Sequence, residues 1–320
     1  MQENFSDVDR KITALVWGGT VSELIFKRWS QGFEWSVDER CALIQQFGGP
    51  CAVIAPVQGY FLQKLLFDDG GGECLPQNNA EADLENISES ERDKFFAMAL
   101  VSMLTMMNKS SWTLCVSNSA DNCKSSITEG GSSQISSCLT DSPIHDFHSS
   151  LRLRKCSCET ELHSFLLNDL SSFMSPFGVL KFLYSVILSK GVDNVINEMD
   201  NPDVPLIDSI HGHGSQNLIN LLICGQAVSN VFDGNRDVAG LCLRGIPNPC
   251  HIGFLTLLEK LRYCTVGTYL KRPKYPVWLL GSETHLSVLF SRECSLVAPD
   301  SILDRAHKIF DQYDPEGLCN

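Results

Sequence analysis

A cysteine suited to act as a nucleophile stands at position 51. It follows a tight Gly-Gly-Pro turn at residues 48–50 and opens an apolar run that continues to Phe67. Apolar residues recur every four positions in this run, which predicts one helical face: Val53, Val57, Phe61 and Leu65. Free backbone N–H groups and the helix dipole at such a helix start favour a thiolate, so we expect a lowered pKa for Cys51.

Two further side chains complete the same chemistry. Gln45 lies six positions before Cys51, from where its amide N–H could reach the oxyanion that forms when a thiolate attacks a carbonyl. The general base is expected to be His285, which opens an alternating segment over residues 285–290 that predicts a strand. A helix cysteine, a distant strand histidine and an upstream glutamine form the layout of papain-like cysteine proteases. The alternative for Cys51 is a small buried hydrophobic residue, since the chain has 14 cysteines.

Composition restricts the partners of the chain. At 320 residues it can hold one large domain or two smaller ones, and 43% hydrophobic residues allow a sizeable core. A net charge of −13 argues against nucleic acid as the main partner, because phosphate binding needs a basic face. The N-terminus has no signal-peptide pattern and no apolar stretch is long enough to span a membrane. We therefore expect a location in the nucleus, the cytoplasm or both, without secretion.

The cysteines do not predict a metal site. Cys156, Cys158 and His163 come nearest to a cluster, but no second pair of ligands follows them with zinc-binding spacing. We expect reduced thiols, no metal ion and no organic cofactor.

Local patterns predict mostly helices with a few strands. Helices are expected over residues 7–16, 23–29, 51–67, 88–107, 159–174, 177–190, 192–199, 216–224, 253–262 and 301–313. Strands are expected over residues 112–116 and in a hairpin of 277–280 with 285–290. Two polar stretches, at about 68–87 and 117–145, are expected to be flexible insertions.

Two segments leave alternatives open. The His-Gly-His-Gly run at residues 211–214 could be a metal site, an oxyanion loop or a turn, and alternating glycines favour the turn. Val231 and Phe232 could belong to the core or to a surface that grips a protein substrate, and the core is the simpler interpretation.

At residues 43–66, with the core Gln-Gln-Phe-Gly-Gly-Pro-Cys-Ala-Val-Ile-Ala-Pro-Val-Gln, the chain resembles the active-site segment of the MINDY deubiquitinases. It is most similar to the branch that carries an EF-hand-like insertion. Supporting segments lie, in order, at residues 25–33, 211–216, 227–234, 253–257 and 277–288. The resemblance extends from about residue 16 to 299.

The resemblance implies an α+β, papain-like cysteine protease fold with helical elaborations. It implies hydrolysis of isopeptide bonds in polyubiquitin, in chains of the lysine linkage that marks proteins for the proteasome. Cys51 matches the nucleophile, His285 the proton acceptor and donor, and Gln45 the oxyanion stabiliser, with Gln46 the substitute if the loop register shifts by one. Glu283 and Ser287 are nearby candidates to orient the histidine, and neither is assigned.

The C-terminal residues depart from the resembled branch. A catalytic domain over residues 1–300 is expected to be followed by a helix leading into a truncated EF-hand-like segment at 301–320. Seven residues remain from Asp314, whereas a calcium loop needs about twelve, so calcium binding is not expected. If a core strand is missing, the alternative is a ubiquitin-binding adaptor without catalytic activity.

Overall fold

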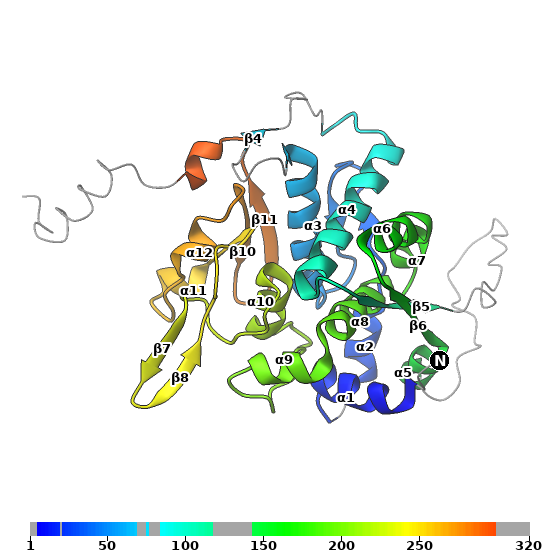
Figure 1. Cartoon of the computed structure of the whole chain (residues 1–320), viewed down its shortest axis with the longest axis horizontal. Helices are drawn as coiled ribbons and strands as arrows, with labels where there is room; N and C mark the ends of the chain where they lie inside the picture. The colour runs from blue at the N-terminus through cyan, green and yellow to red at the C-terminus, as the bar shows by residue number, and fades with distance from the viewer. Residues whose placement is uncertain (1–4, 20, 69–74, 77–83, 118–142, 299–320) are drawn as a thin grey trace, which may run out of the picture.

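The computed structural model describes residues 5–19, 21–68, 75–76, 84–117 and 143–298. At its centre lies helix α3 (Cys51–Leu66), of whose 16 residues 14 are buried. Helices α4 (Glu89–Met107) and α10 (Gln216–Cys224) contact α3, and so do strands β10 (Val277–Gly281) and β11 (Leu286–Phe290) (Figure 1). Because both helices and both strands pack against α3, its first residue, Cys51, lies between the helices and the strands.

Four of the other helices lie within two residues of the bounds that the sequence predicted: α1 (Phe5–Trp17), α2 (Glu23–Trp29), α8 (Gly178–Lys190) and α9 (Val192–Glu198). Helices α6 (Glu159–Asn168), α7 (Leu170–Met174) and α11 (Leu257–Lys260) differ from the predicted helices, whereas α5 (Pro143–Ser150), α12 (Thr268–Lys271) and a 3-10 turn at Cys294–Val297 were not predicted. Two of the predicted helices, α4 and α10, begin at a side-chain cap. Ser88 and Glu91 form a capping box before α4, and the Ser215 hydroxyl accepts from the Leu218 N–H at the start of α10.

Within the described part of the chain, the strands form one three-stranded sheet and four two-stranded pairs. The sheet has the order β11-β10-β9, in which β9 (Gly253–Thr256) is parallel to β10 and β11 is antiparallel to it. The pairs are β1 (Glu34–Trp35) with β2 (Leu43–Ile44), β3 (Phe67–Asp68) with β4 (Leu75–Pro76), β5 (Trp112–Ser117) with β6 (Leu151–Cys156), and β7 (Asn235–Val238) with β8 (Leu241–Arg244). The β10–β11 hairpin and β5 confirm the predicted strands. In the β5–β6 pair, Ser117 is the partner of Leu151.

The predicted helix over residues 253–262 is wrong. Its first four residues form β9, and only Leu257–Lys260 is helical. A Cβ atom on Gly253 would lie 2.4 Å from the Trp278 ring and 2.2 Å from the Leu270 carbonyl oxygen. The glycine thus allows β9 to approach β10 closely, and the parallel pairing with a strand more than twenty residues away overrides the local helical pattern.

The single helix predicted over residues 159–174 is two helices, α6 and α7. The chain leaves the helical conformation at Asp169, which has φ −110° and ψ 21°. Asp is a weak helix former because its side chain competes for backbone hydrogen bonds. The predicted helix over residues 301–313 and the EF-hand-like segment lie outside the described residues, as do residues 118–142.

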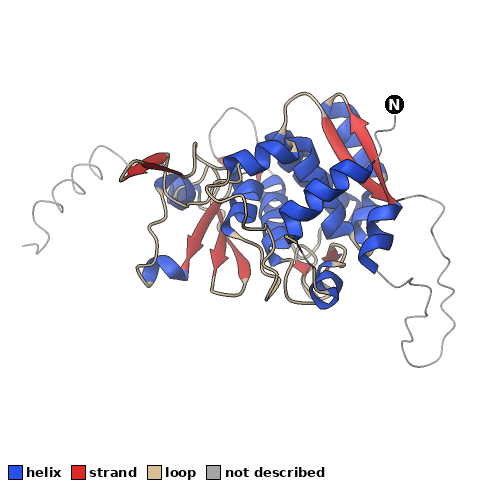
Figure 2. Cartoon of the chain, turned by 90° about the horizontal axis from the view of Figure 1, so that it is seen from below, coloured by secondary structure: helices blue, strands red, loops and turns tan. Residues whose placement is uncertain are grey.

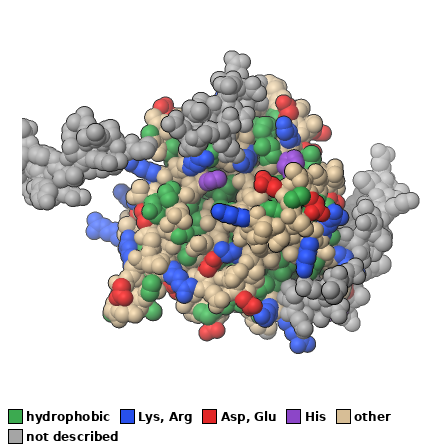
Figure 3. Space-filling view, viewed as in Figure 1, with side chains coloured by type: hydrophobic (Ala, Val, Ile, Leu, Met, Phe, Trp, Pro, Cys, Tyr) green, Lys and Arg blue, Asp and Glu red, His purple; other side chains and the backbone are tan. Residues whose placement is uncertain are grey.

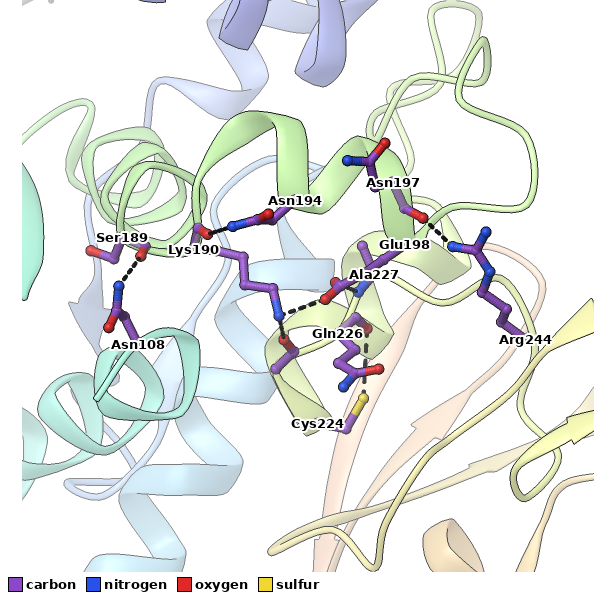
Figure 4. A network of polar contacts seen from close by, with 11 residues as sticks. Asn108, Ser189, Lys190, Asn194, Asn197, Glu198, Cys224, Gln226, Ala227 and Arg244 are labelled. Atoms are coloured by element: carbon purple, nitrogen blue, oxygen red, sulfur yellow. Dashed lines mark hydrogen bonds and ion pairs between the residues drawn. The ribbon is translucent and has the colours of Figure 1, made fainter. Parts of the chain in front are cut away.

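A half-buried ion pair joins the end of α8 to α9, beside the segment that follows α10 (Figure 4). Lys190 Nζ lies 2.6 Å from Glu198 Oε1 and donates to the Gly225 carbonyl oxygen at 2.8 Å. The other Glu198 oxygen accepts from the Ala227 N–H at 2.8 Å. Both carboxylate oxygens and the ammonium group therefore have partners, and these contacts hold α8 and α9 against the segment that follows α10.

The architecture is α+β, with helices in the middle and strands on two sides of them (Figure 2). On the face in Figure 3, acidic and basic side chains are intermingled, and Lys and Arg do not gather into one stripe. Among the described residues, no helix combines the length and the apolar character needed to cross a bilayer.

Candidate active site

The thiol of Cys51 lies at the N-terminus of α3, where the turn at residues 48–50 meets the helix. The Pro50 carbonyl oxygen accepts from the N–H groups of Val53 and Ile54, both at 2.9 Å, and so begins the helix directly at Cys51. Cys51 is 7% exposed and its sulfur lies 3.8 Å from the Gly49 carbonyl oxygen. The helix start thus places the sulfur just below the protein surface.

Burial raises the pKa of the Cys51 thiol in the free protein. Hydrogen bonds from the backbone N–H groups of Leu286, Ala52 and Cys51 itself act in the opposite direction but do not outweigh the desolvation. The prediction of a lowered pKa from the helix start alone is therefore wrong. Since the backbone N–H groups do favour the thiolate, the remaining stabilisation has to come from a partner such as a protonated histidine.

A groove of about 550 Å³ brings the three predicted residues together. Cys51, Gln45 and His285 all line it. The rest of its wall comes from α3, β2 and β11 and from residues 39–42 and 84. It is largely apolar: Ala42, Leu43, Ile44, Ile54, Ala55, Leu62, Leu84, Leu286, Val288 and Phe290. A second thiol, Cys41, also lines the groove, and burial raises its pKa too. An apolar groove with a few convergent polar groups is the usual form of a binding site.

His285 enters the groove from the turn between β10 and β11. Ser282 holds this turn, because its hydroxyl accepts from the His285 N–H at 3.1 Å and donates to the His285 carbonyl oxygen at 3.0 Å. The histidine is exposed, whereas Leu286, the next residue, is buried and directs its backbone N–H to the Cys51 sulfur. The strand therefore places the histidine next to the residue that contacts the thiol. Ser287 lines the same groove and Glu283 is exposed in the turn.

The structure separates the two glutamines that the sequence left as alternatives. The Gln45 amide nitrogen donates to the Phe47 carbonyl oxygen at 2.8 Å, and its side chain lines the groove. The Gln46 amide donates to the Glu34 carboxylate and lines a separate pocket of about 200 Å³. An amide nitrogen carries two N–H groups, so Gln45 keeps one N–H beyond the one that binds Phe47.

The turn before Cys51 needs glycine at one of its two positions. Gly49 has φ +135°, and a Cβ atom there would lie 2.8 Å from Trp29 Nε1. Trp29 Nε1 also donates to the Gly212 carbonyl oxygen at 2.9 Å, so the indole lies between the turn and residues 211–214. At Gly48 a Cβ atom would meet nothing within 4 Å. The close approach of Trp29 therefore explains the second glycine but not the first.

The His-Gly-His-Gly run is a turn, as the alternating glycines predicted. Gly212 has φ +74°, and the Asp208 carboxylate accepts from the N–H groups of Ile210 at 3.0 Å and His211 at 2.7 Å. A Cβ atom on Gly214 would lie 2.2 Å from Ala52 Cβ, so this turn packs against the first turn of α3. No group of three potential metal ligands occurs among the described residues.

The core interpretation of the segment after α10 is confirmed for Val231, which is 8% exposed. Phe232 is half-buried, with the Arg236 guanidinium 4.1 Å from its ring centroid. Trp29 and the Leu286 backbone were missed by sequence reasoning as parts of the site. Their roles come from contacts across twenty or more residues of sequence, and the only local signal was Gly49, which leaves room for the indole.

An α+β fold that brings a helix-start cysteine and a strand-start histidine to one groove is the arrangement of a cysteine-type hydrolase. The family model "Deubiquitinating enzyme MINDY-3/4, conserved domain" matches residues 14–311, and the chain belongs to this family. The match agrees with the resemblance carried by the active-site segment.

Relatives with known names agree with this membership. The chain is 44% identical over 330 residues to the ubiquitin carboxyl-terminal hydrolase MINDY-3 of Danio rerio, which covers 97% of this chain and 71% of the relative. It is 40% identical over 334 residues to the human protein of that name, with the same coverage. It is 35% identical over 307 residues to the probable ubiquitin carboxyl-terminal hydrolase MINDY-4 of Bos taurus, which covers 92% of this chain and 36% of the relative. No solved structure matches the chain.

Proposed function

We propose that this chain is a thiol deubiquitinase with a papain-like fold that hydrolyses isopeptide bonds in polyubiquitin. The observation that carries the proposal is the groove lined by Cys51, His285 and Gln45, with the Leu286 N–H directed to the Cys51 sulfur. The substrate class comes from the family and from the names of the relatives. The preferred chains are those of the lysine linkage that marks proteins for the proteasome, and the site of action is the nucleus, the cytoplasm or both.

The first half-reaction forms a thioester. His285 takes the proton of Cys51, and the thiolate attacks the carbonyl carbon of the isopeptide bond. The carbonyl oxygen becomes an oxyanion, which accepts from the free N–H of Gln45 and from backbone N–H groups beside Cys51. His285 then returns the proton to the lysine nitrogen as the C–N bond breaks, and the amine leaves.

The second half-reaction releases ubiquitin. His285 takes a proton from water, and the hydroxide attacks the thioester carbonyl. The C–S bond then breaks to give a carboxylic acid, and the imidazolium returns its proton to the sulfur, which restores the free thiol. The same oxyanion donors serve both steps. None of these steps requires a metal ion or an organic cofactor.

Because Cys51 is buried, formation of its thiolate depends on His285 as the proton acceptor. Because burial raises the pKa of the Cys51 thiol, proton transfer to an imidazole beside it is what provides the thiolate. His285 is exposed, so its ring can rotate toward the sulfur without displacing core side chains.

The test is incubation with tetra-ubiquitin of the proteasome-targeting linkage and, in parallel, with tetra-ubiquitin of other linkages. We expect shorter chains from the first substrate with the wild type and none with Cys51→Ala. Cys41→Ala is the matched control, because Cys41 is a second buried thiol in the same groove. Cleavage by Cys51→Ala, or its loss only in Cys41→Ala, would overturn the assignment of the nucleophile. Equal cleavage of all linkages would overturn the linkage preference alone.

The alternative of a ubiquitin-binding adaptor without catalysis has no support in the groove, in the family or in the names of the relatives. A ubiquitin probe with a C-terminal electrophile separates the two functions. It reacts with Cys51 of an enzyme and leaves an adaptor unlabelled.

A further inference from the structure

A buried glutamine supports the loop that carries Gln45. Gln31 follows α2 and is 8% exposed, so its amide must find its partners within the protein. Its oxygen accepts from the N–H groups of Gln46 at 2.9 Å and Phe47 at 3.4 Å. Its nitrogen donates to the carbonyl oxygens of Arg28 at 2.5 Å and Phe47 at 2.8 Å. Three of these four contacts are to the backbone of the loop at residues 46–47.

The Phe47 carbonyl oxygen is shared by two glutamine amides. Gln31 Nε2 and Gln45 Nε2 each donate to it at 2.8 Å. A carbonyl oxygen accepts two hydrogen bonds, so these two donors fill it. The Gln45 oxygen is buried without a hydrogen-bond partner among the described residues. The bond to Phe47 is therefore what orients the Gln45 amide, and Gln31 fixes the atom at the other end of that bond.

The Gln31 backbone is itself anchored away from the groove. Its carbonyl oxygen accepts from the Val179 N–H of α8 at 3.1 Å, and the preceding Ser30 carbonyl oxygen accepts from Phe177 at 2.8 Å. A Cβ atom on Gly32 would lie 2.3 Å from the Met174 carbonyl oxygen, so the chain passes α7 in close contact. The Phe47 side chain is 56% exposed and gives the loop little anchorage of its own.

We propose that Gln31 is a positioning residue that holds the Gln45 amide in the orientation needed for the oxyanion, acting through the Phe47 carbonyl group. This inference rests on the proposed function for the direction of its kinetic effect. The position of the loop itself can be measured without any substrate.

Gln31→Glu is the sharpest substitution. It keeps the shape of the side chain and the oxygen that accepts from Gln46 and Phe47. It replaces the donating nitrogen by a carboxylate oxygen, which faces the Arg28 and Phe47 carbonyl oxygens and repels them. Gln31→Met, which keeps the length and removes all four hydrogen bonds, serves if the glutamate variant does not fold. Ser88→Ala is the matched control for stability, since it removes the cap of α4 and contacts no residue of the loop.

A double-mutant cycle on Gln31 and Gln45 gives the kinetic test, with a ubiquitin C-terminal amide as the substrate. We expect Gln31→Glu to lower kcat about 10-fold to 100-fold with KM within about twofold, and Gln45→Ala to lower kcat about 100-fold to 1000-fold. The double variant should be no slower than Gln45→Ala, because Gln31 acts through Gln45. Ser88→Ala should keep the wild-type kcat. An equal kcat loss from Gln31→Glu in both backgrounds, or a wild-type kcat for Gln31→Glu, would overturn the proposal.

Hydrogen exchange of the free protein separates this inference from the proposed function. The Gln46 and Phe47 amides should exchange at least about tenfold faster in Gln31→Met than in wild type, and at the wild-type rate in Ser88→Ala. A wild-type protein that cleaves no ubiquitin substrate overturns the proposed function, and the exchange rates then decide whether Gln31 fixes the loop. Unchanged exchange in Gln31→Met would overturn the inference even in an active enzyme.

Discussion

The loop that leads into Cys51 and the turn that carries His285 line one groove but are held in different ways. The loop is fixed by the Gln31 amide at residues 46–47 and by the Trp29 indole against Gly49. The turn depends on the Ser282 hydroxyl and the backbone, and His285 is exposed. The side that carries the proposed nucleophile and oxyanion donor is therefore preorganised, whereas the proposed base retains freedom to adjust when a substrate enters.

Removal of the base should give the largest effect in this comparison. His285→Ala is expected to lower kcat about 1000-fold, because a general acid and base typically contributes about 100-fold to 10,000-fold. Its melting temperature should stay at the wild-type value, since the side chain is exposed. Thermal unfolding beside a ubiquitin cleavage assay measures both quantities. A large fall in melting temperature would contradict the view that the turn is held independently of its histidine.

Substitution in the preorganised loop should affect stability as well as rate. Gly49→Ala forces a Cβ atom against Trp29 at φ +135° and is expected to cost about 1–3 kcal/mol of unfolding free energy. It should also lower kcat about 10-fold to 100-fold by displacing the loop. Gly48→Ala is the matched control, because its Cβ atom meets nothing within 4 Å. Equal denaturation midpoints for the two variants would remove Trp29 as a support.

Alkylation of the free protein tests the protonation of the nucleophile. Burial raises the pKa of Cys51, whereas a hydrogen bond with the Thr160 hydroxyl lowers the pKa of the exposed Cys158. A raised pKa means less thiolate at neutral pH, so iodoacetamide at pH 7.5 should modify Cys158 several-fold faster than Cys51. The Cys51 rate should keep rising with pH beyond the ordinary pKa of a thiol. Peptide mapping that finds Cys51 modified first would show that the thiolate is already formed without substrate.

Loosening the histidine turn should give the smallest effect. Ser282→Ala removes the hydroxyl bonds to the His285 backbone and is expected to lower kcat about threefold to tenfold. Its unfolding free energy should change by less than about 1 kcal/mol, because the residue is exposed. Steady-state kinetics and urea denaturation measure the two changes. A kcat loss as large as that of Gly49→Ala would abolish the contrast between loop and turn.

Local signals in the sequence were enough to predict many of the helices and strands. The bounds of α4 and α10 follow from helix caps and apolar spacing, and these depend on neighbours in sequence. The helix predicted over residues 253–262 failed because β9 exists only through its parallel partner β10. Strand β6 and the β7–β8 hairpin were not predicted, since their pairing likewise depends on distant or weakly patterned residues.

The features of the candidate site likewise fall into those that the sequence predicts and those that depend on contacts with distant residues. Cys51, Gln45 and His285 were predicted as site residues from residue type, spacing and resemblance, and all three line one groove. The direction of the Cys51 pKa shift could not be found, because desolvation depends on how α3 packs between the sheet and the helices. Gln31 lies within a motif that carried the resemblance, yet its role depends on a contact with a loop fifteen residues further along.

The connection between β5 and α5 offers a practical attachment point. Ser117 ends β5 and is paired with Leu151, the residue that follows α5, so the elements on both sides of residues 118–142 pack on the body. Lengthening a connection whose ends are already fixed costs only about 0.6 kcal/mol per doubling of its length. A fluorescent protein inserted within residues 118–142 would therefore report on the position of the enzyme in a living cell.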